Sequence, residues 1–368
     1  MKILFVAPRF HTNQYQVVKT LQEKGHEVTF HVAFSGPTED HRLLTPTNFR
    51  QSVLSRLIEK VFGKDTVKRP YYFPSMINYW SELKKLKPDL IVIRDPFKYF
   101  SLLVAIYALL QSSKILFYTQ EELYRKRSSL NRLKIHFTLL LFKARWMTPI
   151  LGINNGDLTK PKNMFFVPLP IPTKTNAAIK TAIKNSTPQI LMIGKYHQDR
   201  KKHMLFIQAL NKLREKYNFN ATIVGECVME SQLEKYNFLQ QTLEQLGLTE
   251  IIKLRKNIPF YQMEKLYETH DIFVLPAINE QYGVSVTEAL ANGLPVICTD
   301  TCGARFNIIN GENGYIVKSS SLEDLTNAIE QLVSNEHRLT EMSKKAAAYI
   351  KKELSGEAFY RSFSKFMI

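Results

Sequence analysis

Two glutamates eight positions apart, Glu280 and Glu288, are the residues of this chain whose type and spacing most directly suggest chemistry. The apolar run that ends at Pro276 predicts a buried strand, and a helix is expected from about Val284 to Asn292. Glu280 then lies in the loop between them, and Glu288 lies one turn inside the helix. Such a helix points unpaired N–H groups and the positive end of its dipole at the loop, which makes an anion site.

We expect this anion to be a diphosphate. Gly283 lets the backbone approach it closely. The expected donors are the backbone amides of Tyr282, Gly283, Val284 and Ser285. A carboxylate beside a diphosphate is useful as an acceptor for hydroxyl groups, at about 1.5–3 kcal/mol for each hydrogen bond. Glu288 therefore suits a ribose and Glu280 the hydroxyls of a sugar, whereas the alternative is a loop acid and an ordinary surface glutamate.

A second loop carries the positive charge that a diphosphate needs. The strand expected over Gln189–Ile193 ends at Gly194, and Lys195 and Lys201 follow it. A lysine-rich loop taken alone is more often a solvated surface. Because this loop and the Glu280 loop both follow buried strands, parallel strands would bring them to one edge of a sheet. Lys195 and Lys201 are therefore the expected phosphate ligands.

These motifs resemble those of the family 4 retaining glycosyltransferases. Residues 280–297, EQYGVSVTEALANGLPVI, match the family pattern E-x-F/Y-G-x-x-x-x-E-A-x-A-x-G-x-P-V-I. Residues 189–210, QILMIGKYHQDRKKHMLFIQAL, resemble the family's G-R-x(4–5)-K-G element, whose Arg and Lys grip the diphosphate. Lys195 and Lys201 fall on those two positions, with Lys195 in place of Arg and Lys202 in place of Gly. The change at 195 keeps the charge but loses the bidentate fork.

The resemblance implies an α/β protein of the GT-B fold, with two Rossmann-like parallel-sheet domains facing a central cleft. It implies a nucleotide-diphosphate sugar as donor, UDP first and GDP next, and hexosyl or N-acetylhexosaminyl transfer with retention. No metal ion and no cofactor are expected, and the chain has no Asp-x-Asp element. The nucleobase is placed near Ile258, Glu280 against the sugar hydroxyls, and Lys201 and Lys195 on the leaving group.

The first half departs from the family. A Gly-Gly turn usual after the first strand is replaced by Phe10-His11-Thr12-Asn13, and a histidine usual after a later strand is missing from Tyr118-Thr119-Gln120-Glu121-Glu122. His11 and Gln120 are the candidates for the acceptor side, although polar residues in such loops more often cap a helix. The expected acceptor is a glycan or a lipid-linked glycan, as in the synthesis of cell-surface polysaccharide or glycolipid.

Two other classes of protein are alternatives to a glycosyltransferase. A GT-B nucleotide-sugar epimerase should present carboxylates and histidines from both halves, and a phosphorylase needs a pyridoxal-linked lysine in a much longer chain. A non-catalytic basic binding protein would not need the donor motif, and no nucleic-acid module motif occurs in the sequence. Titration with nucleoside diphosphates separates an enzyme from a binder.

Short apolar runs alternate with amphipathic segments along all 368 residues, which favours two parallel α/β domains. We expect an N-terminal acceptor-side domain over 1–172, a linker over 173–187 and a C-terminal donor domain over 188–352. Residues 353–368 are expected to form a helix that returns to the first domain. The expected strands are Lys2–Ala7, His26–Val32, Asp89–Ile93, Lys114–Tyr118, Leu151–Ile153, Met164–Val167, Gln189–Ile193, Ala221–Val224, Ile251–Leu254, Ile272–Leu275, Val296–Thr299 and Tyr315–Val317.

The positive charge lies entirely in the first half. Residues 1–186 contain 29 Lys and Arg against 12 Asp and Glu, whereas residues 187–368 contain 21 of each. An excess confined to one domain indicates an anionic partner. Two segments, Gln51–Arg69 and Arg125–Trp146, combine cations with apolar residues as interfacial helices do, so an anionic membrane surface is one expected partner.

Compartment and redox state are inferred from what the composition excludes. Three cysteines are too few and too irregular for a disulfide framework, and the first apolar run is too short for a signal peptide. A cytoplasmic location is expected. If the first half binds an anionic membrane, the protein would lie peripherally on the inner face of the cytoplasmic membrane.

Overall fold

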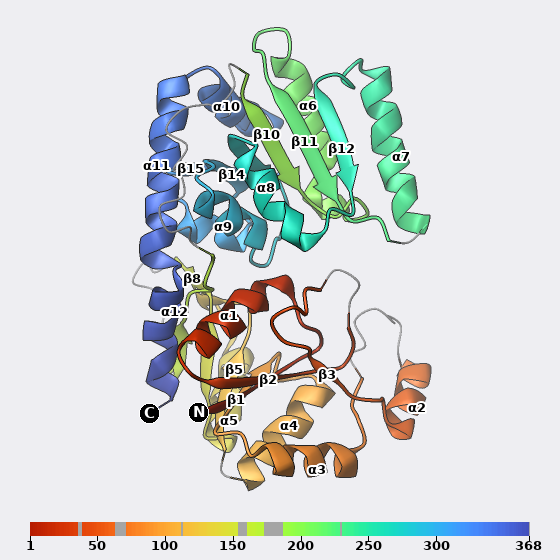
Figure 1. Cartoon of the computed structure of the whole chain (residues 1–368), viewed down its shortest axis with the longest axis vertical. Helices are drawn as coiled ribbons and strands as arrows, with labels where there is room; N and C mark the ends of the chain where they lie inside the picture. Colours follow the sequence, from red (N-terminus) through yellow and green to blue (C-terminus); the bar gives the residue numbers. More distant parts are fainter. Residues whose placement is uncertain are drawn as a thin grey trace. The chain divides into compact units, whose positions relative to one another are not determined.

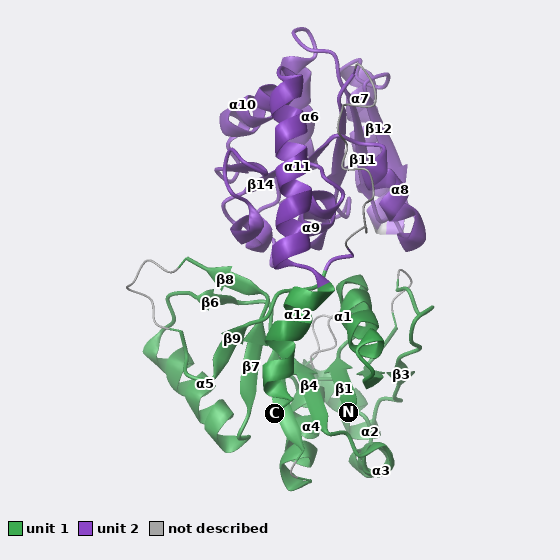
Figure 2. Cartoon of the chain, turned by 60° about the vertical axis from the view of Figure 1, so that its left-hand side comes forward, with its two compact units in different colours: residues 1–170, 356–368 green, residues 171–355 purple. Residues whose placement is uncertain are grey.

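The computed structural model describes residues 1–35, 39–62, 71–111, 113–153, 160–172, 187–228 and 230–367. The chain forms two compact units, Met1–Pro170 with Gly356–Ile368, and Ile171–Ser355 (Figures 1 and 2). The expected boundaries at residues 172 and 353 lie close to these. Of the expected linker, residues 173–186 lie outside the described residues.

The first unit is built on a seven-stranded parallel sheet of order β3-β2-β1-β4-β5-β7-β9. Its central strands are almost wholly apolar, as expected of strands that helices cover on both faces. A separate parallel pair joins β6 and β8. The strands are β1 Lys2–Ala7, β2 Glu27–Val32, β3 Thr47–Asn48, β4 Leu90–Arg94, β5 Lys114–Tyr118, β6 Glu122–Tyr124, β7 Arg145–Thr148, β8 Ile150–Gly152 and β9 Met164–Phe166.

Helices α3, α4 and α5 bury side chains in one cluster with this sheet, so they form a layer on one side of it. Helix α12 packs on α1 instead: Tyr360 Oη lies 3.0 Å from His26 Nε2, and Lys24 pairs with Glu357. The last segment of the chain therefore belongs to the first unit. The helices are α1 Thr12–Glu23, α2 Val53–Phe62, α3 Met76–Leu86, α4 Tyr99–Leu110, α5 Ser129–Leu141 and α12 Gly356–Phe363, followed by the 3-10 turn η4 Ser364–Phe366.

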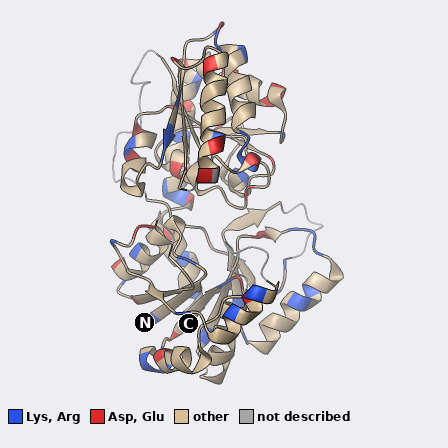
Figure 3. Ribbon diagram, turned by 90° about the vertical axis from the view of Figure 1, so that its right-hand side faces the viewer, with Lys and Arg blue, Asp and Glu red and all other residues tan. Residues whose placement is uncertain are grey.

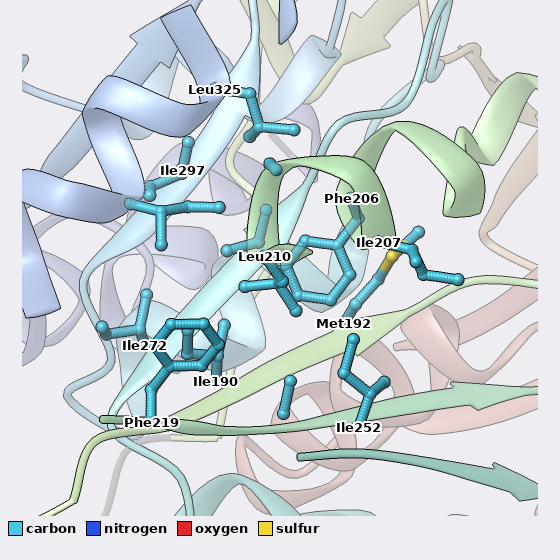
Figure 4. Close-up of a cluster of buried hydrophobic side chains, with 14 of the residues drawn as sticks. Ile190, Met192, Phe206, Ile207, Leu210, Phe219, Ile252, Ile272, Ile297 and Leu325 are labelled. Atoms are coloured by element: carbon cyan, nitrogen blue, oxygen red, sulfur yellow. The ribbon is translucent and has the colours of Figure 1, made fainter. Parts of the chain in front are cut away.

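The second unit has a six-stranded parallel sheet of order β12-β11-β10-β13-β14-β15. Figure 4 shows its main apolar cluster, in which Phe206 and Leu210 of α6 lie among strand residues such as Ile190 and Ile272. The strands are β10 Gln189–Ile193, β11 Asn220–Gly225, β12 Ile252–Lys256, β13 Ile272–Leu275, β14 Val296–Thr299 and β15 Gly314–Val317.

The helices of this unit are α6 His203–Leu213, α7 Glu230–Gln245, α8 Met263–Glu268, α9 Val284–Ala291, α10 Leu322–Val333 and α11 Glu336–Glu353, with 3-10 turns η1 Asp199–Lys201, η2 Phe260–Gln262 and η3 Gly303–Asn307. Strand order runs outward from β10 in one direction and from β13 in the other. The loops after β10 and β13 therefore diverge, and ligands of doubly wound sheets bind at such a point.

The parallel α/β class expected from the sequence is confirmed, and the expected strands lie within two residues of the observed ones. One segment was interpreted wrongly. Residues 125–146 do not form a single helix, because α5 ends at Leu141 and Arg145 begins the buried strand β7. Among the described residues, no helix combines the length and hydropathy needed to cross a membrane.

Candidate functional site

The loops that follow β10 and β13 meet through an ion-pair cluster. The Glu280 carboxylate accepts a hydrogen bond from Lys201 Nζ at 2.8 Å and pairs with the Arg200 guanidinium. The Lys201 and Glu280 side chains are only 10% and 13% exposed, whereas Arg200 is 40% exposed. The sequence-predicted residues Glu280 and Lys201 are thus brought together at the point where the strand order diverges.

Local backbone geometry directs Lys201 into this position. The 3-10 turn η1 ends at Lys201, and Lys202 then adopts a left-handed φ of 57° before α6 begins. The Lys201 methylenes lie against Gly194, where an added Cβ would come within 3.1–3.2 Å of them. His203 Nε2 lies 3.1 Å from the Gly194 carbonyl oxygen. The lysine stem thus packs closely over the end of β10, and a larger residue at 194 would have to displace it by a few tenths of an ångström.

Main-chain hydrogen bonds hold the Glu280 loop. Ile278 donates its N–H to the Arg200 carbonyl at 2.7 Å, and Gly303 donates to the Glu280 carbonyl at 2.9 Å. Asn279 between them has a left-handed φ of 49°. Because these hydrogen bonds fix the main chain on both sides of Glu280, the position of its side chain depends on the backbone as well as on Lys201 and Arg200.

The charge state of Glu280 follows from two opposing effects. Burial alone would raise the pKa of its carboxyl group, but the charges and hydrogen bonds of Lys201 and Arg200 lower the pKa below the usual value. The carboxylate therefore stays ionised at neutral pH. An ionised Glu280 can accept hydrogen bonds from hydroxyl groups and cannot act as a proton donor.

The start of α9 lies directly beside this cluster. Gly283 caps the helix with φ 83°, and an added Cβ there would lie 2.9 Å from Cys302 Sγ and 3.4 Å from Glu280 Cγ. Val284 and Ser285 hold two of the first amides of the helix, which have no carbonyl partner within it. The expected anion-binding amides at the start of α9 and the Lys201 ammonium therefore both lie next to the Glu280 loop.

Tyr282 adds only its main chain to this surface. Its side chain is buried in the second unit, so it supports the loop instead of facing a ligand. Glu288 lies one turn further along α9, where its carboxylate accepts a hydrogen bond from Tyr267 Oη at 2.8 Å. Burial raises the pKa of Glu288, and the Tyr267 hydrogen bond opposes this. Ile258 packs against the cluster that contains Tyr267 and Val286, which keeps it near α9.

Lys195 does not join the Glu280 cluster. Its ammonium pairs with Glu226 at the end of β11, and its side chain is half-exposed. At the neighbouring strand end, Asn257 bridges the same loop, accepting a hydrogen bond from Cys227 N–H and donating one to Cys227 carbonyl, each at 2.8 Å. The two expected phosphate ligands thus have different partners, and the role of Lys195 stays a prediction.

His11 and Gln120 lie in the first unit. His11 is the N-cap of α1, and its backbone N–H donates to Gln14 Oε1 at 3.2 Å. Gln120 donates to Tyr118 Oη at 3.2 Å. The position of His11 agrees with the alternative that it caps a helix. The acceptor-side roles of both residues stay predictions.

Sequence reasoning missed Arg200 and Tyr267. Arg200 could have been found, because it precedes Lys201 in the basic run of the same loop. Tyr267 lies 21 positions before Glu288, and only the packing of α8 on α9 brings them together. The arrangement as a whole offers two cations and a helix N-terminus to an anion, with two carboxylates beside them for hydroxyl groups.

Comparison with known proteins agrees with this chemistry. Residues 173–352 match the family model described as "Glycosyl transferases group 1". A curated relative from Corynebacterium urealyticum, "D-inositol 3-phosphate glycosyltransferase", is 27% identical over 173 residues, which are 46% of this chain and 41% of the relative. The chain thus matches less than half the length of that relative.

Two solved structures resemble the whole chain. A glycosyltransferase from Rickettsia africae ESF-5 has a TM-score of 0.73 at 15% identity, covering 100% of this chain and 97% of the other. Alr3699/HepE of Anabaena in complex with UDP-glucose has a TM-score of 0.72 at 14% identity, covering 99% and 98%. At such identities the likeness shows the fold alone, which is the GT-B fold of two parallel-sheet domains.

Proposed function

We propose that the chain, whose residues 173–352 match the model of the group 1 glycosyl transferases, transfers a hexosyl or N-acetylhexosaminyl group from a nucleotide-diphosphate sugar with retention of configuration. The observation that carries this proposal is the Glu280–Lys201–Arg200 cluster at the start of α9. A UDP-sugar is favoured as donor and a GDP-sugar comes next. The UDP-glucose bound by the Anabaena protein supports the first choice.

Each residue of this cluster has its own role in the proposed transfer reaction. The bond from the anomeric carbon to the diphosphate breaks, its electrons pass to the leaving oxygen, and Lys201, Arg200 and the α9 amides stabilise the resulting charge. The acceptor oxygen attacks the same face of the anomeric carbon, and its proton passes to the leaving oxygen. Glu280 holds sugar hydroxyls and Glu288 holds the ribose. We propose that no metal ion takes part, because these cations and amides supply the positive charge.

Donor binding must change the contacts of Glu280. Its carboxylate now holds both Lys201 and Arg200, and a diphosphate would compete for the same cations. Arg200 is the more exposed of the two and is therefore the more readily reoriented. We propose Arg200 as the second phosphate ligand, in the role that the sequence pattern gave to Lys195.

The acceptor in this proposal is a glycan or a lipid-linked glycan of a cell-surface polysaccharide or glycolipid. The cationic first half of the chain supports an acidic acceptor or an acceptor held at an anionic surface. The reaction would take place in the cytoplasm.

A panel of nucleotide sugars tests the donor assignment by thermal stabilisation. A ligand at a hundred times its Kd stabilises the native state by about 2.7 kcal/mol, which raises the Tm of a domain this size by about 5–10 °C. UDP-sugars should give this shift and Lys201→Met should remove most of it. A protein that no nucleotide stabilises would be a binder of another kind, whereas one that interconverts donor sugars without an acceptor would be an epimerase. The anomeric configuration of the transfer product, read by NMR, decides retention.

A further inference from the structure

Helix α5 exposes large apolar side chains to solvent. Leu130, Leu133, Phe137, Leu140 and Leu141 are between 49% and 76% exposed, and their spacing of three and four residues places them along one side of the helix. Ile135 and Leu139 are the two α5 residues buried toward the sheet. The helix is thus apolar on its outer side as well as its inner side.

Helix α4 repeats this pattern in the same helix layer. Its exposed apolar residues occupy the corresponding positions and are Tyr99, Leu102, Ile106, Leu109 and Leu110. Both helices bury their other sides in one cluster, so both rows lie on the outward surface of that layer. Lys134 of α5 lies 3.8 Å from the ring centroid of Phe97, just before α4, which ties the two helices together. Monomeric proteins rarely leave large apolar patches in water, so two such rows on one helix layer indicate an interaction surface.

The α5 part of this surface is accompanied by cations. Residues 123–153 contain seven Lys and Arg and no Asp or Glu. Figure 3 shows that acidic residues are sparse in the first unit, whereas basic residues mark several of its helices. The exposed cations of the segment are Arg125, Lys126, Arg132, Lys134, Lys143 and Arg145. A partner for this face must therefore accept apolar side chains and also carry negative charge.

Arg127, also in this segment, does not serve such a partner. Its guanidinium is buried and donates hydrogen bonds to the carbonyls of Leu123 at 3.0 Å and Glu122 at 2.7 Å. Helix α2 adds a further exposed apolar row with Arg56 and Lys60, but Lys64, Lys68 and Arg69 lie outside the described residues. The argument therefore rests on α4 and α5.

We propose that the outer surface of α4 and α5 docks the first unit on an anionic lipid bilayer. Helices of this kind lie in the plane of the interface, with apolar side chains among the acyl chains and Lys and Arg at the headgroups. A bilayer satisfies both requirements, because its acyl chains accept apolar side chains and its anionic headgroups pair with Lys and Arg. This docking goes beyond the proposed transfer reaction, and it is measured without donor or acceptor.

Flotation with vesicles tests the proposal. The full chain should float with phosphatidylcholine–phosphatidylglycerol vesicles at low salt, and binding should fall steeply as salt is raised. Arg132→Glu combined with Lys134→Glu should lower the partition coefficient about 30-fold or more. Leu133→Ser combined with Phe137→Ser should lower it at unchanged charge. The matched control is Lys351→Glu with Lys352→Glu on α11 of the second unit, which makes the same charge change and should leave flotation unchanged.

Each outcome decides the proposal. Loss of flotation in both α5 variants but not in the α11 variant supports it, provided that thermal unfolding shows all three folded. Equal loss in the α5 and α11 charge variants would overturn it, because net charge alone would then explain binding. Failure of the wild-type chain to float at low salt would also overturn it. Sedimentation that shows dimers lost on Leu133→Ser with Phe137→Ser, without flotation, would assign the face to a second copy. Nucleotide stabilisation is read separately, so failure here leaves the donor assignment standing.

Discussion

Replacing Lys201 by methionine distinguishes the role of Lys201 from that of Lys195, although the sequence pattern predicts both as phosphate ligands. Methionine keeps an unbranched apolar stem over Gly194 and removes the ammonium. Glu280 then retains Arg200 as a counter-ion, so the variant does not leave a buried charge unpaired. The fold should persist, and the loss should fall on the leaving group.

The size of that loss follows from the burial of the pair. A charge-assisted hydrogen bond contributes about 1.5–3 kcal/mol, and the 10% exposure of Lys201 places it toward the upper end. A loss of about 2–3 kcal/mol from the transition state lowers kcat about 30–150-fold. Lys195→Met is the matched comparison, because this lysine is half-exposed on Glu226. An ammonium that pairs with Glu226 outside the Glu280 cluster should contribute at most about 1 kcal/mol to the transition state, so kcat should change less than about fivefold.

The assay is release of nucleoside diphosphate under single-turnover conditions, with the dissociation constant of UDP measured on the same variants. We expect Lys201→Met to lower the rate far more than Lys195→Met. An equal loss in the two variants would refute the reasoning, since Lys195 would then reach the diphosphate despite its pairing with Glu226. A wild-type rate in Lys201→Met would refute the assignment of the whole cluster.

Three further predictions concern the second unit. Glu288→Gln keeps a partner for Tyr267 but removes the charge, so UDP should bind about tenfold more weakly in calorimetry; unchanged affinity would contradict the ribose assignment. Transfer should survive a strong chelator, and a complete loss that manganese or magnesium restores would contradict metal independence. Burial lowers the pKa of His203 from 6.5 to about 4, so the unfolded chain binds a proton that the native state excludes. Stability should therefore fall as the pH drops through this window, by up to about 1.4 kcal/mol per pH unit, and His203→Gln should flatten the dependence of Tm on pH.

The sheets could be predicted because their strands carry unbroken apolar runs. Lys2–Ala7 and Ile272–Leu275 are buried almost throughout, and no helical pattern competes there. The strand β7, Arg145–Thr148, was missed for the opposite reason. It follows α5 after three residues and begins with arginine, so the cationic pattern of the helix continues into it without a break. Short connections of this kind leave no turn signal to read.

The carboxylates and Lys201 could be placed from the sequence because fixed spacings carry them to known ends of strands and helices. Pairings between loops could not. Glu226 follows β11 and Lys195 follows β10, and only the neighbouring positions of these strands bring the two charges together. The burial of the Tyr282 side chain could not be predicted either, because a tyrosine beside Gly283 is equally consistent with a ligand contact and with core packing.

The last segment of the chain completes the unit that the ribosome makes first. Residues 356–367 leave the ribosome after the whole of the second unit, yet they complete the first, where Phe359 and Phe363 are buried and Tyr360 reaches His26. While the second unit is made as an insertion, the nascent first unit therefore exposes the surface of α1 that α12 later covers. Stalled translation within residues 187–355 would release a chain whose earlier-made unit is the unfinished one, and a chaperone that holds such chains should bind at α1.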